Sequence, residues 1–382
     1  MSRLEELIQV LCPDGVEYRN LGDIGRVAMC KRIMKAETVS DGDIPFYKIG
    51  TFGKAPNAYI SVETYERYKR NYSFPRKGDV LISAAGTIGR TVIYDGEAAY
   101  YQDSNIVWLE HDESQVINKY LYYCYQLSPW CISTGGTIAR LYNDNIAKAE
   151  IPVPPLPIQQ EIVRILDTFT ALEAELEAEL EKRKKQYGYY RDALLASDND
   201  LPMVTLGQIF QLKAGKFIQA THISEVKDNE HAFPCYGGNG LRGFVKNYNQ
   251  NASNVLIGRQ GALCGNIKRV SGRYYATEHA VVVSAKNAVN IDWAFHMLTS
   301  MNLNQYKSKS AQPGLSVEKL EQLVVPLPPL AKQERIAAIL DRFDALVNDI
   351  TQGLPAEIAA RRKQYEYYRD KLLTFKRKEA AV

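Results

Sequence analysis

The segment IPVPPLPIQQEIVRILDTF (residues 151–169) returns later in the chain as VPLPPLAKQERIAAILDRF (residues 325–343). The two copies are offset by 174 residues and share three prolines, the Leu-Asp pair and the final phenylalanine. A second match follows, between KKQYGYYRDALL (184–195) and RKQYEYYRDKLL (362–373), at an offset of 178. The second copy has therefore gained four residues between its shared segments. Repetition on this scale indicates an internal duplication.

Fainter matches lie upstream of each shared segment. LGDI (21–24) resembles LGQI (206–209), and DVLI (79–82) resembles NVLI (254–257). A glycine-containing loop follows both DVLI and NVLI. We predict a first domain with a short N-terminal helix in residues 1–156, a spacer helix in 157–197, a second domain in 198–330 and a second spacer helix in 331–382. We expect the matched parts to serve the same function in both copies, and the divergent parts to act on different targets.

The composition excludes several broad classes of protein. The 382 residues are 46% hydrophobic, which argues against general disorder, and 47 basic against 44 acidic residues give a net charge of only +3. Positive charge for a nucleic-acid partner would have to be concentrated on one face. No apolar run is long enough for a membrane span, and the N-terminus lacks a signal-peptide core, so we expect a cytoplasmic protein. The six cysteines form no CxxC pair and are expected to be free thiols, with no metal site.

The well-matched segments have the pattern of long helices. After the proline-rich punctuation, apolar residues recur at steps of three and four from Ile162 to Leu194. A single helix over residues 158–195 would span roughly 57 Å at ~1.5 Å per residue. We expect the two spacer helices to form an antiparallel coiled coil, although each could instead pack on its own domain. The four extra residues near Gln352–Pro355 favour a kink or break in the second helix.

The divergent parts are predicted to be compact α+β domains, so that the fold class is mixed α/β with an internal pseudo-two-fold duplication. Short strand-like runs (79–82, 90–94, 105–109, 254–257 and 280–284) alternate with turns, and one helix follows in each domain (118–130 and 292–302). A short helix is predicted over Arg3–Leu11. No domain follows the last helix. The order of domains and helices is therefore nearly cyclic, because the domain that would follow the second spacer helix is the one at the N-terminus.

Motifs for catalysis are missing from the sequence. It contains no phosphate-binding GxxxxGK[ST] loop, no GxSxG elbow and no Asn/Asp-Pro-Pro-Tyr/Phe motif of an amino-methyltransferase. Two different domains held apart by helices suit a target with two half-sites, such as DNA. Two alternatives stay open: a duplicated adaptor that binds protein ligands, and an enzyme that acts alone on DNA.

The doubled pattern [IV]P[VL]PPL, Q-x-x-I, IL-D-x-F and QYxYYRDxLL resembles the specificity subunit of type I restriction–modification enzymes. The segments CPDGVEYRNLGDI (12–24), FPCYGGNGLRGF (233–244), RYYATEHAVVV (273–283) and QPGLSVEKL (312–320) also resemble this family. The resemblance covers nearly the whole chain.

This resemblance implies a non-catalytic subunit. Its two target-recognition domains each read one half of a bipartite, asymmetric site in double-stranded DNA, and its helices set the spacer length. It recruits two DNA adenine methyltransferase subunits that bind S-adenosylmethionine. Where restriction or translocase subunits join, ATP and Mg are bound by those partners and not by this chain. A related methyltransferase system without a nuclease is the alternative within this family.

Comparison of the aligned loops suggests which residues contact DNA. Ala84-Ala85 corresponds to Arg259-Gln260, and Arg and Gln can pair with guanine and adenine edges, whereas Ala can only touch a thymine methyl. We therefore predict base reading by this loop, with a phosphate contact or mere solvation of Arg259 as the alternative. The predicted DNA-contact residues are Ser83, Thr87, Arg90, Gln102, Ser104, Thr134, Thr137 and Arg140 in the first domain, and Asn239, Arg242, Arg259, Gln260, Lys268, His279, Lys307 and Lys309 in the second. Tyr187, Tyr190, Tyr365 and Tyr368 are predicted to serve helix packing or partner binding rather than base stacking.

Overall fold

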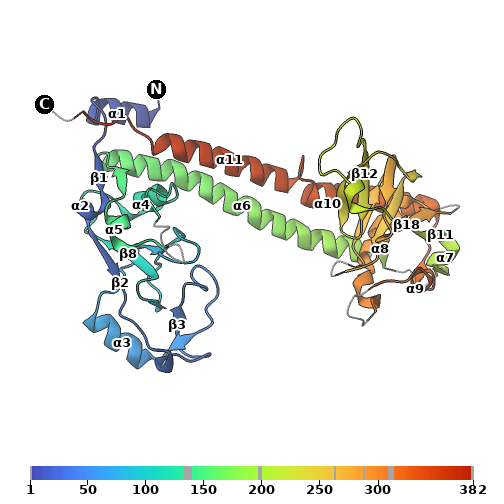
Figure 1. Ribbon diagram of the computed structural model, residues 1–382, viewed down its shortest axis with the longest axis horizontal. Coiled ribbons are helices and arrows are strands. Elements are labelled where there is room, and N and C mark those ends of the chain that lie inside the picture. Colours follow the sequence, from blue (N-terminus) through green and yellow to red (C-terminus); the bar gives the residue numbers. More distant parts are fainter. Residues whose placement is uncertain are drawn as a thin grey trace. The chain divides into compact units, whose positions relative to one another are not determined.

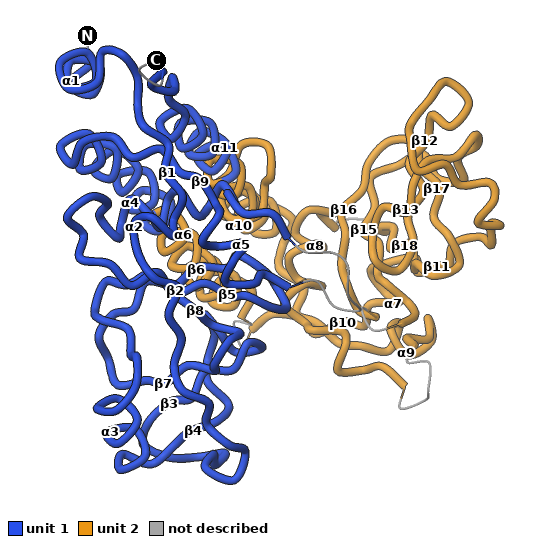
Figure 2. Tube along the Cα trace, turned by 60° about the vertical axis from the view of Figure 1, so that its left-hand side comes forward, with its two compact units in different colours: residues 1–175, 359–382 blue, residues 176–358 orange. Residues whose placement is uncertain are grey.

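The computed structural model describes residues 2–132, 140–196, 200–261, 264–286, 289–308 and 314–379 (Figure 1). The chain divides into two compact units (Figure 2): unit 1 comprises Met1–Glu175 and Ala359–Val382, and unit 2 comprises Leu176–Ile358. The end of the chain thus belongs to the same unit as its beginning, as the cyclic layout requires. Both units take in parts of the spacer helices.

Unit 1 is a mixed α+β domain. Its elements before the first long helix are α1 (Arg3–Leu11), β1 (Tyr18–Asn20), α2 (Leu21–Ile24), β2 (Arg26–Met29), β3 (Ile44–Tyr47), β4 (Tyr59–Ile60), α3 (Val62–Asn71), β5 (Val80–Ser83), β6 (Thr91–Ile93), β7 (Tyr100–Tyr101), β8 (Ile106–Glu110), α4 (Asn118–Tyr125), α5 (Asn143–Ala147) and β9 (Glu150–Pro152). The expected N-terminal helix is confirmed with its bounds. Ser2 caps it in a capping box with Glu5.

Unit 2 repeats this arrangement. Its elements are β10 (Met203–Thr205), α7 (Leu206–Ile209), β11 (Phe210–Ala214), β12 (Phe233–Gly237), β13 (Gly240–Val245), β14 (Gln250–Asn251), β15 (Asn254–Gly258), β16 (Ile267–Val270), β17 (Arg273–Ala276), β18 (Ala280–Ala285), α8 (Ile291–Ser300), α9 (Val317–Glu321) and β19 (Val324–Pro326).

The main sheet and a two-stranded ribbon have the same topology in both units, which confirms the duplication, whereas the second sheet has three strands in unit 1 and four in unit 2. The main sheet has the strand order β2-β8-β5-β6 in unit 1 and β11-β18-β15-β16 in unit 2, with antiparallel neighbours throughout. A second sheet contains a parallel pair in each unit, β3 with β7 and β12 with β17. A two-stranded ribbon, β1-β9 or β10-β19, leads into the proline-rich segment. The faint upstream matches in sequence therefore mark equivalent strands.

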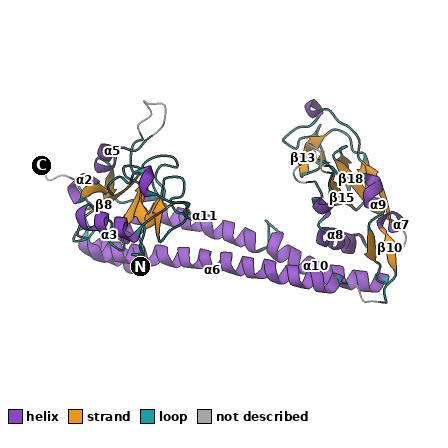
Figure 3. Cartoon of the chain, turned by 90° about the horizontal axis from the view of Figure 1, so that it is seen from below, coloured by secondary structure: helices purple, strands orange, loops and turns teal. Residues whose placement is uncertain are grey.

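Three long helices complete the chain (Figure 3): α6 (Leu156–Leu195), α10 (Leu330–Asn348) and α11 (Leu354–Leu372). The predicted first spacer helix is thus continuous over 40 residues. Within unit 1, α11 packs antiparallel on the first part of α6, since Phe169 stacks on Tyr368 at 5.4 Å and Glu173 pairs with Arg362 at 2.5 Å.

The same contact recurs within unit 2 between the second part of α6 and α10. Tyr190 stacks on Phe343 with ring centroids 5.3 Å apart and planes 24° apart. Phe343 and Tyr190 are the repeat equivalents of Phe169 and Tyr368, whose planes are 23° apart. The packing of the spacer helices therefore uses the same phenylalanine–tyrosine pair once in each unit.

The second spacer helix is broken, as the extra four residues suggested. α10 ends at Asn348 and α11 begins at Leu354. Gly353 donates its N–H to the Asp349 carbonyl, and a Cβ at Gly353 would lie 2.4 Å from the Ala345 carbonyl oxygen. Only glycine fits against the last turn of α10 at this distance. The Asp349 carboxylate accepts the Thr351 N–H at 2.7 Å and so closes the turn.

Residues near the C-terminus close unit 1 beside its first strand. The Val16 N–H donates to the Lys376 carbonyl at 2.8 Å, and the Lys378 N–H donates to the Val16 carbonyl at 3.0 Å. The Arg377 guanidinium pairs with Glu150 at 2.6 Å. Leu373 is 2% exposed and belongs to the main core of unit 1.

Candidate nucleic-acid interface

The loop between β5 and β6 in unit 1 is held in shape by its own polar groups. The Ser83 hydroxyl accepts the Arg90 N–H at 2.9 Å and donates to the Thr87 carbonyl. Ser83 is only 2% exposed, so it fixes the loop, and its placement does not support the predicted direct contact with DNA. Thr87, at the loop's tip, is exposed. Gly86 and Gly89 have φ of +65° and +82°, which other residues rarely adopt.

The other predicted residues of unit 1 connect this loop to its neighbours. The half-buried Arg90 donates from Nη1 to the Phe52 carbonyl at 2.8 Å. Gln102 accepts the Ile49 N–H on Oε1 at 2.8 Å. Arg140 donates to the carbonyl of Ser104, a residue in the left-handed region at φ +47°. The structure therefore brings the described first-domain residues into one group of loops, where Arg90, Gln102 and Arg140 each keep further donors for a ligand.

In unit 2 an open hollow with a volume of about 490 Å³ gathers four predicted residues, Asn239, Arg242, Gln260 and His279, with two glycines. The Gln260 Oε1 lies 2.7 Å from the His279 Nδ1. These two residues are 19 apart in sequence and meet because β15 pairs antiparallel with β18, with Gly258 opposite Ala280. The hollow offers amide, guanidinium and imidazole groups of the kinds that read base edges.

Arg259 is half-buried at the edge of this loop. Its backbone is fixed on both sides, since its N–H donates to the His279 carbonyl at 2.8 Å and its carbonyl accepts the Leu315 N–H at 2.9 Å. Lys268 is exposed, and its Cε lies 3.5 Å from where a Cβ on Gly240 would be. Lys307 is exposed as well. The equivalent of Arg259 in unit 1, Ala84, is 1% exposed.

Two residues of this region were missed by the sequence analysis. Thr277 is fully buried and Glu278 is partly buried, and their Oγ1 and Oε2 atoms are buried without a hydrogen-bond partner among the described residues. The other carboxylate oxygen of Glu278 lies 3.1 Å from the His279 Nε2. The signal lay in RYYATEHAVVV, where a Thr-Glu pair directly precedes the predicted His279. Thr134, Thr137 and Lys309 lie outside the described residues.

The four predicted tyrosines of the helices fall into two groups. Tyr187 is 8% exposed, and its hydroxyl lies 3.1 Å from the His296 Nδ1 in the core of unit 2, so it is a packing residue rather than a partner contact. Tyr365 packs against the core of unit 1. Tyr190 and Tyr368 are 40% and 36% exposed beside their stacked phenylalanines. They keep a surface that a partner could cover.

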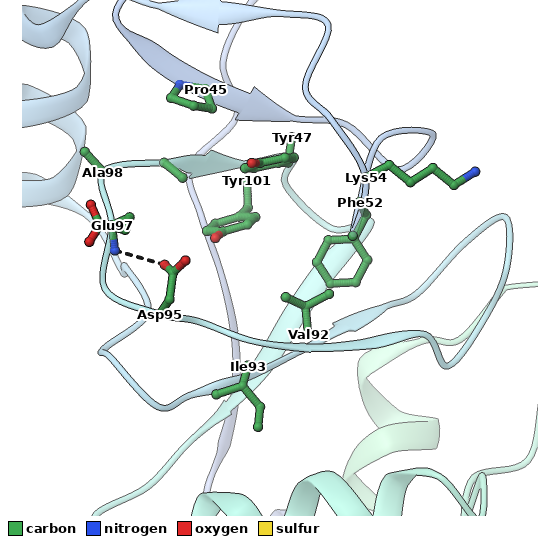
Figure 4. Close-up of a pocket in the computed structure, with 12 residues that line it drawn as sticks. Pro45, Tyr47, Phe52, Lys54, Val92, Ile93, Asp95, Glu97, Ala98 and Tyr101 are labelled. Atoms are coloured by element: carbon green, nitrogen blue, oxygen red, sulfur yellow. Dashed lines mark hydrogen bonds between the residues drawn. The ribbon is translucent and has the colours of Figure 1, made fainter. Parts of the chain in front are cut away.

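A hollow of about 270 Å³ in unit 1 has a different character (Figure 4). The stacked rings of Tyr47 and Tyr101 and the side chain of Phe52 line it, with Asp95 and Glu97 at its rim. The Asp95 carboxylate accepts the Glu97 N–H at 2.9 Å. Lys54 also lines this hollow, but none of the predicted DNA-contact residues does, so we do not count the hollow as part of the candidate interface.

Comparison with known proteins agrees with this architecture. A family model described as type I restriction modification DNA specificity domain matches residues 13–182 and again residues 199–360. The two units therefore correspond to two tandem DNA specificity domains. The chain belongs to the family of type I restriction–modification specificity subunits.

Individual relatives support the same assignment. The chain is 44% identical over 339 residues to the type I restriction enzyme EcoprrI specificity subunit of Escherichia coli, covering 83% of this chain and 84% of that protein. It is 31% identical to the EcoR124I/EcoR124II specificity subunit of Escherichia coli, covering 99% and 98%. The crystal structure of the S subunit of a type I restriction–modification system from M. genitalium has the same fold, with a TM-score of 0.61 at 18% identity over 94% of this chain and 96% of that one.

The described residues contain no cluster of three or more His, Cys, Asp or Glu side chains that could hold a metal ion. No helix in the described part of the chain is long and apolar enough to cross a membrane.

Proposed function

We propose that each unit reads one half of a bipartite, asymmetric site in double-stranded DNA. The observation that carries this proposal is the difference between equivalent loops on main sheets of the same strand order. Unit 2 presents Arg259 and Gln260 where unit 1 has Ala84 and Ala85. Identical scaffolds with different side chains at the same position suit two related but distinct sequences.

The hollow of unit 2 supplies the chemistry for one half-site. Arg242 and Asn239 are exposed at its edge and can donate to base edges or phosphates. The Gln260 amide is oriented by His279, which leaves its NH₂ group for a base acceptor when the imidazole Nδ1 carries the proton.

We infer that the chain itself is non-catalytic and acts through other subunits. The partners are two DNA adenine methyltransferase subunits that bind S-adenosylmethionine, and restriction or translocase subunits with ATP and Mg where the system includes them. The helices set the spacing between half-sites and dock these subunits, with Tyr190 and Tyr368 as candidate contacts. The repeated Phe–Tyr stacking supports a stiff spacer.

Electrophoretic binding tests this proposal directly. The chain is mixed with duplex DNA carrying its methylation site, which methylome sequencing identifies, with and without the modification subunit and S-adenosylmethionine. We expect weak binding by the chain alone and specific binding by the complex. Failure of the complex to prefer its own site over a scrambled duplex contradicts the proposal and favours a protein-binding adaptor.

A further inference from the structure

Phe217 of unit 2 stands apart from the other phenylalanines of the chain. Of the eleven, all of which lie in described parts of the chain, it alone is exposed, at 71%, while the other ten are buried or half-buried. It lies in the connection between β11 and β12, directly after Lys216. Removing such a ring from water is favourable, so this side chain is suited to a contact that the chain does not make by itself.

The backbone that carries this ring is fixed from the side of β17. The Lys216 N–H donates to the Ala276 carbonyl at 2.9 Å. The Phe217 carbonyl accepts the hydroxyl of Tyr275 at 3.1 Å. The exposed ring is therefore presented by a segment that two hydrogen bonds hold against a strand, which suits insertion into a partner.

This segment is continuous with the candidate nucleic-acid interface. Lys216 pairs in parallel with Thr277, which lies two residues before His279. On its other side the Thr277 N–H donates to the carbonyl of Tyr236 at 2.9 Å, in the strand that leads to the hairpin with Asn239. Lys216 is itself exposed and adds positive charge beside the ring. A duplex bound at the hollow of His279 and Asn239 would thus have the ring beside it.

The surroundings of the ring favour a contact with bases over a contact with phosphates. Phe217 lines an open hollow of about 740 Å³ together with Lys246 and His231. Lys246 pairs with Glu230 at 3.1 Å, and the His231 Nδ1 lies 3.1 Å from the Asp228 carboxylate. A phosphate would have to compete with these carboxylates, whereas an aromatic ring can contact bases without any charge.

Unit 1 has a charged residue at the equivalent position. The offset of 185 between LGDI and LGQI is kept by the short 3₁₀ helices at Lys35–Glu37 and Ala220–His222, so that Arg32 is the counterpart of Phe217. The Arg32 Nε donates to the Asp103 carboxylate at 2.9 Å. The two units therefore present an ion pair and an exposed ring at the same place of the repeat.

We propose that Phe217 inserts between two base pairs in or beside the half-site that unit 2 reads and kinks the duplex there. Apolar side chains, phenylalanine among them, partly unstack one base step in this way. Because pyrimidine–purine steps are the easiest to unstack, the ring selects for such a step without hydrogen bonds to it. Arg32 gives unit 1 no such ring at this position, so the duplex is distorted in one half only. This inference rests on the proposed function.

The fluorescence of 2-aminopurine tests the proposal, since it rises when this base is unstacked. The full chain, assembled with its modification subunit and S-adenosylmethionine, is titrated with duplexes that carry 2-aminopurine at one position in turn, in each half-site and in the spacer. The methylated adenine is left unlabelled, because methyltransferases extrude their target base. We expect a rise at one step in or beside one half-site, with no rise at the other half.

Three variants of the chain complete the test. Phe217→Ala should abolish the rise and weaken binding of the complex to its site by about fivefold or more, whereas Phe217→Trp should keep both. Val226→Ala is the matched control, because Val226 is 70% exposed in the same connection between β11 and β12, and it should change neither. The urea midpoint of Phe217→Ala should equal that of the native chain, because the ring that is lost is exposed.

Three results would overturn the inference: no rise at any labelled position, an unchanged affinity of Phe217→Ala, or a loss of affinity that leaves the fluorescence as it was. Failure of Phe217→Ala to assemble with the modification subunit in the absence of DNA would also overturn it and would identify a protein contact. A native complex that prefers its own site while no labelled position responds refutes the insertion and leaves the proposed function intact. A complex that shows no preference for its site refutes the proposed function itself.

Discussion

Arg259→Ala is expected to relax the sequence preference of one half-site while leaving the fold unchanged. The backbone of Arg259 is fixed by hydrogen bonds to His279 and Leu315, at 2.8 and 2.9 Å, and alanine keeps both. The change therefore removes the guanidinium and little else. A bidentate arginine–guanine pair is worth about 1–3 kcal/mol of discrimination, or roughly fivefold to 150-fold in relative affinity.

The assay is competition binding by the assembled complex. Duplexes differ from the site at single positions in one half or the other, and each series is run at several salt concentrations. We expect discrimination to fall in the half read by unit 2 and to stay unchanged in the other half. Arg342→Ala, an exposed arginine on α10, is the matched control and should alter neither.

An equal loss of affinity for every duplex, with a salt slope reduced by about one, would refute the base-reading role. That result identifies a phosphate contact, because backbone contacts carry no sequence information and release counterions.

Three further predictions concern the fold. Burial lowers the pKa of His296 despite its contact with Asp341, so the unfolded chain takes up a proton first and the free energy of unfolding of unit 2 should fall as the pH drops below about 6.5. In unit 1 the counterpart of His296 is Tyr123, which bonds Asp167 as His296 contacts Asp341. His296→Tyr should therefore flatten this slope in urea titrations, and an unchanged slope would contradict the assignment. Gly353→Ala should destabilise unit 2 by roughly 1–3 kcal/mol because its Cβ would lie 2.4 Å from a backbone carbonyl, and an unaltered urea midpoint would argue against it. Gln333→Leu should lower the free energy of unfolding of unit 2 by roughly 2–5 kcal/mol, since this buried amide bonds the Pro328 carbonyl and the Asn290 N–H, both at 2.8 Å. Gln159→Leu should destabilise unit 1 as much, because the Gln159 amide bonds the Pro154 carbonyl at 2.7 Å and the Ile117 N–H at 3.0 Å, and a loss below about 1 kcal/mol in either unit would refute the reasoning.

The sequence predicted the elements that proline and glycine delimit. The proline-rich segments end a strand and start a helix in both copies, so α6 and α10 begin close to where the pattern placed them. The break near Gly353 followed from four inserted residues. By contrast, α3 (Val62–Asn71) was not foreseen, because its sequence is highly polar and only Tyr65 is buried. The helix expected over residues 118–130 ends at Tyr125, and Ser128 turns to φ +49° soon after.

The candidate interface was less predictable than the fold, because it depends on strand pairing. Gln260 and His279 could be proposed singly, yet their contact follows only from the register of β15 on β18. Ser83 shows the opposite difficulty. All four residues of β5 are buried, so the usual alternation between inside and outside gives no clue that its hydroxyl faces the loop.

The closure of unit 1 by residues 359–379 has a consequence for how the protein is made. Unit 2 is one uninterrupted segment and can fold once it has left the ribosome, because domains generally fold as units during synthesis. Unit 1 is translated first, but it lacks Leu373 and the contacts of Val16 with Lys376 and Lys378 until the last residues emerge. The domain that is synthesised first is therefore completed last. A nascent chain arrested before α11 should carry a protease-resistant unit 2 behind a unit 1 with an exposed apolar face.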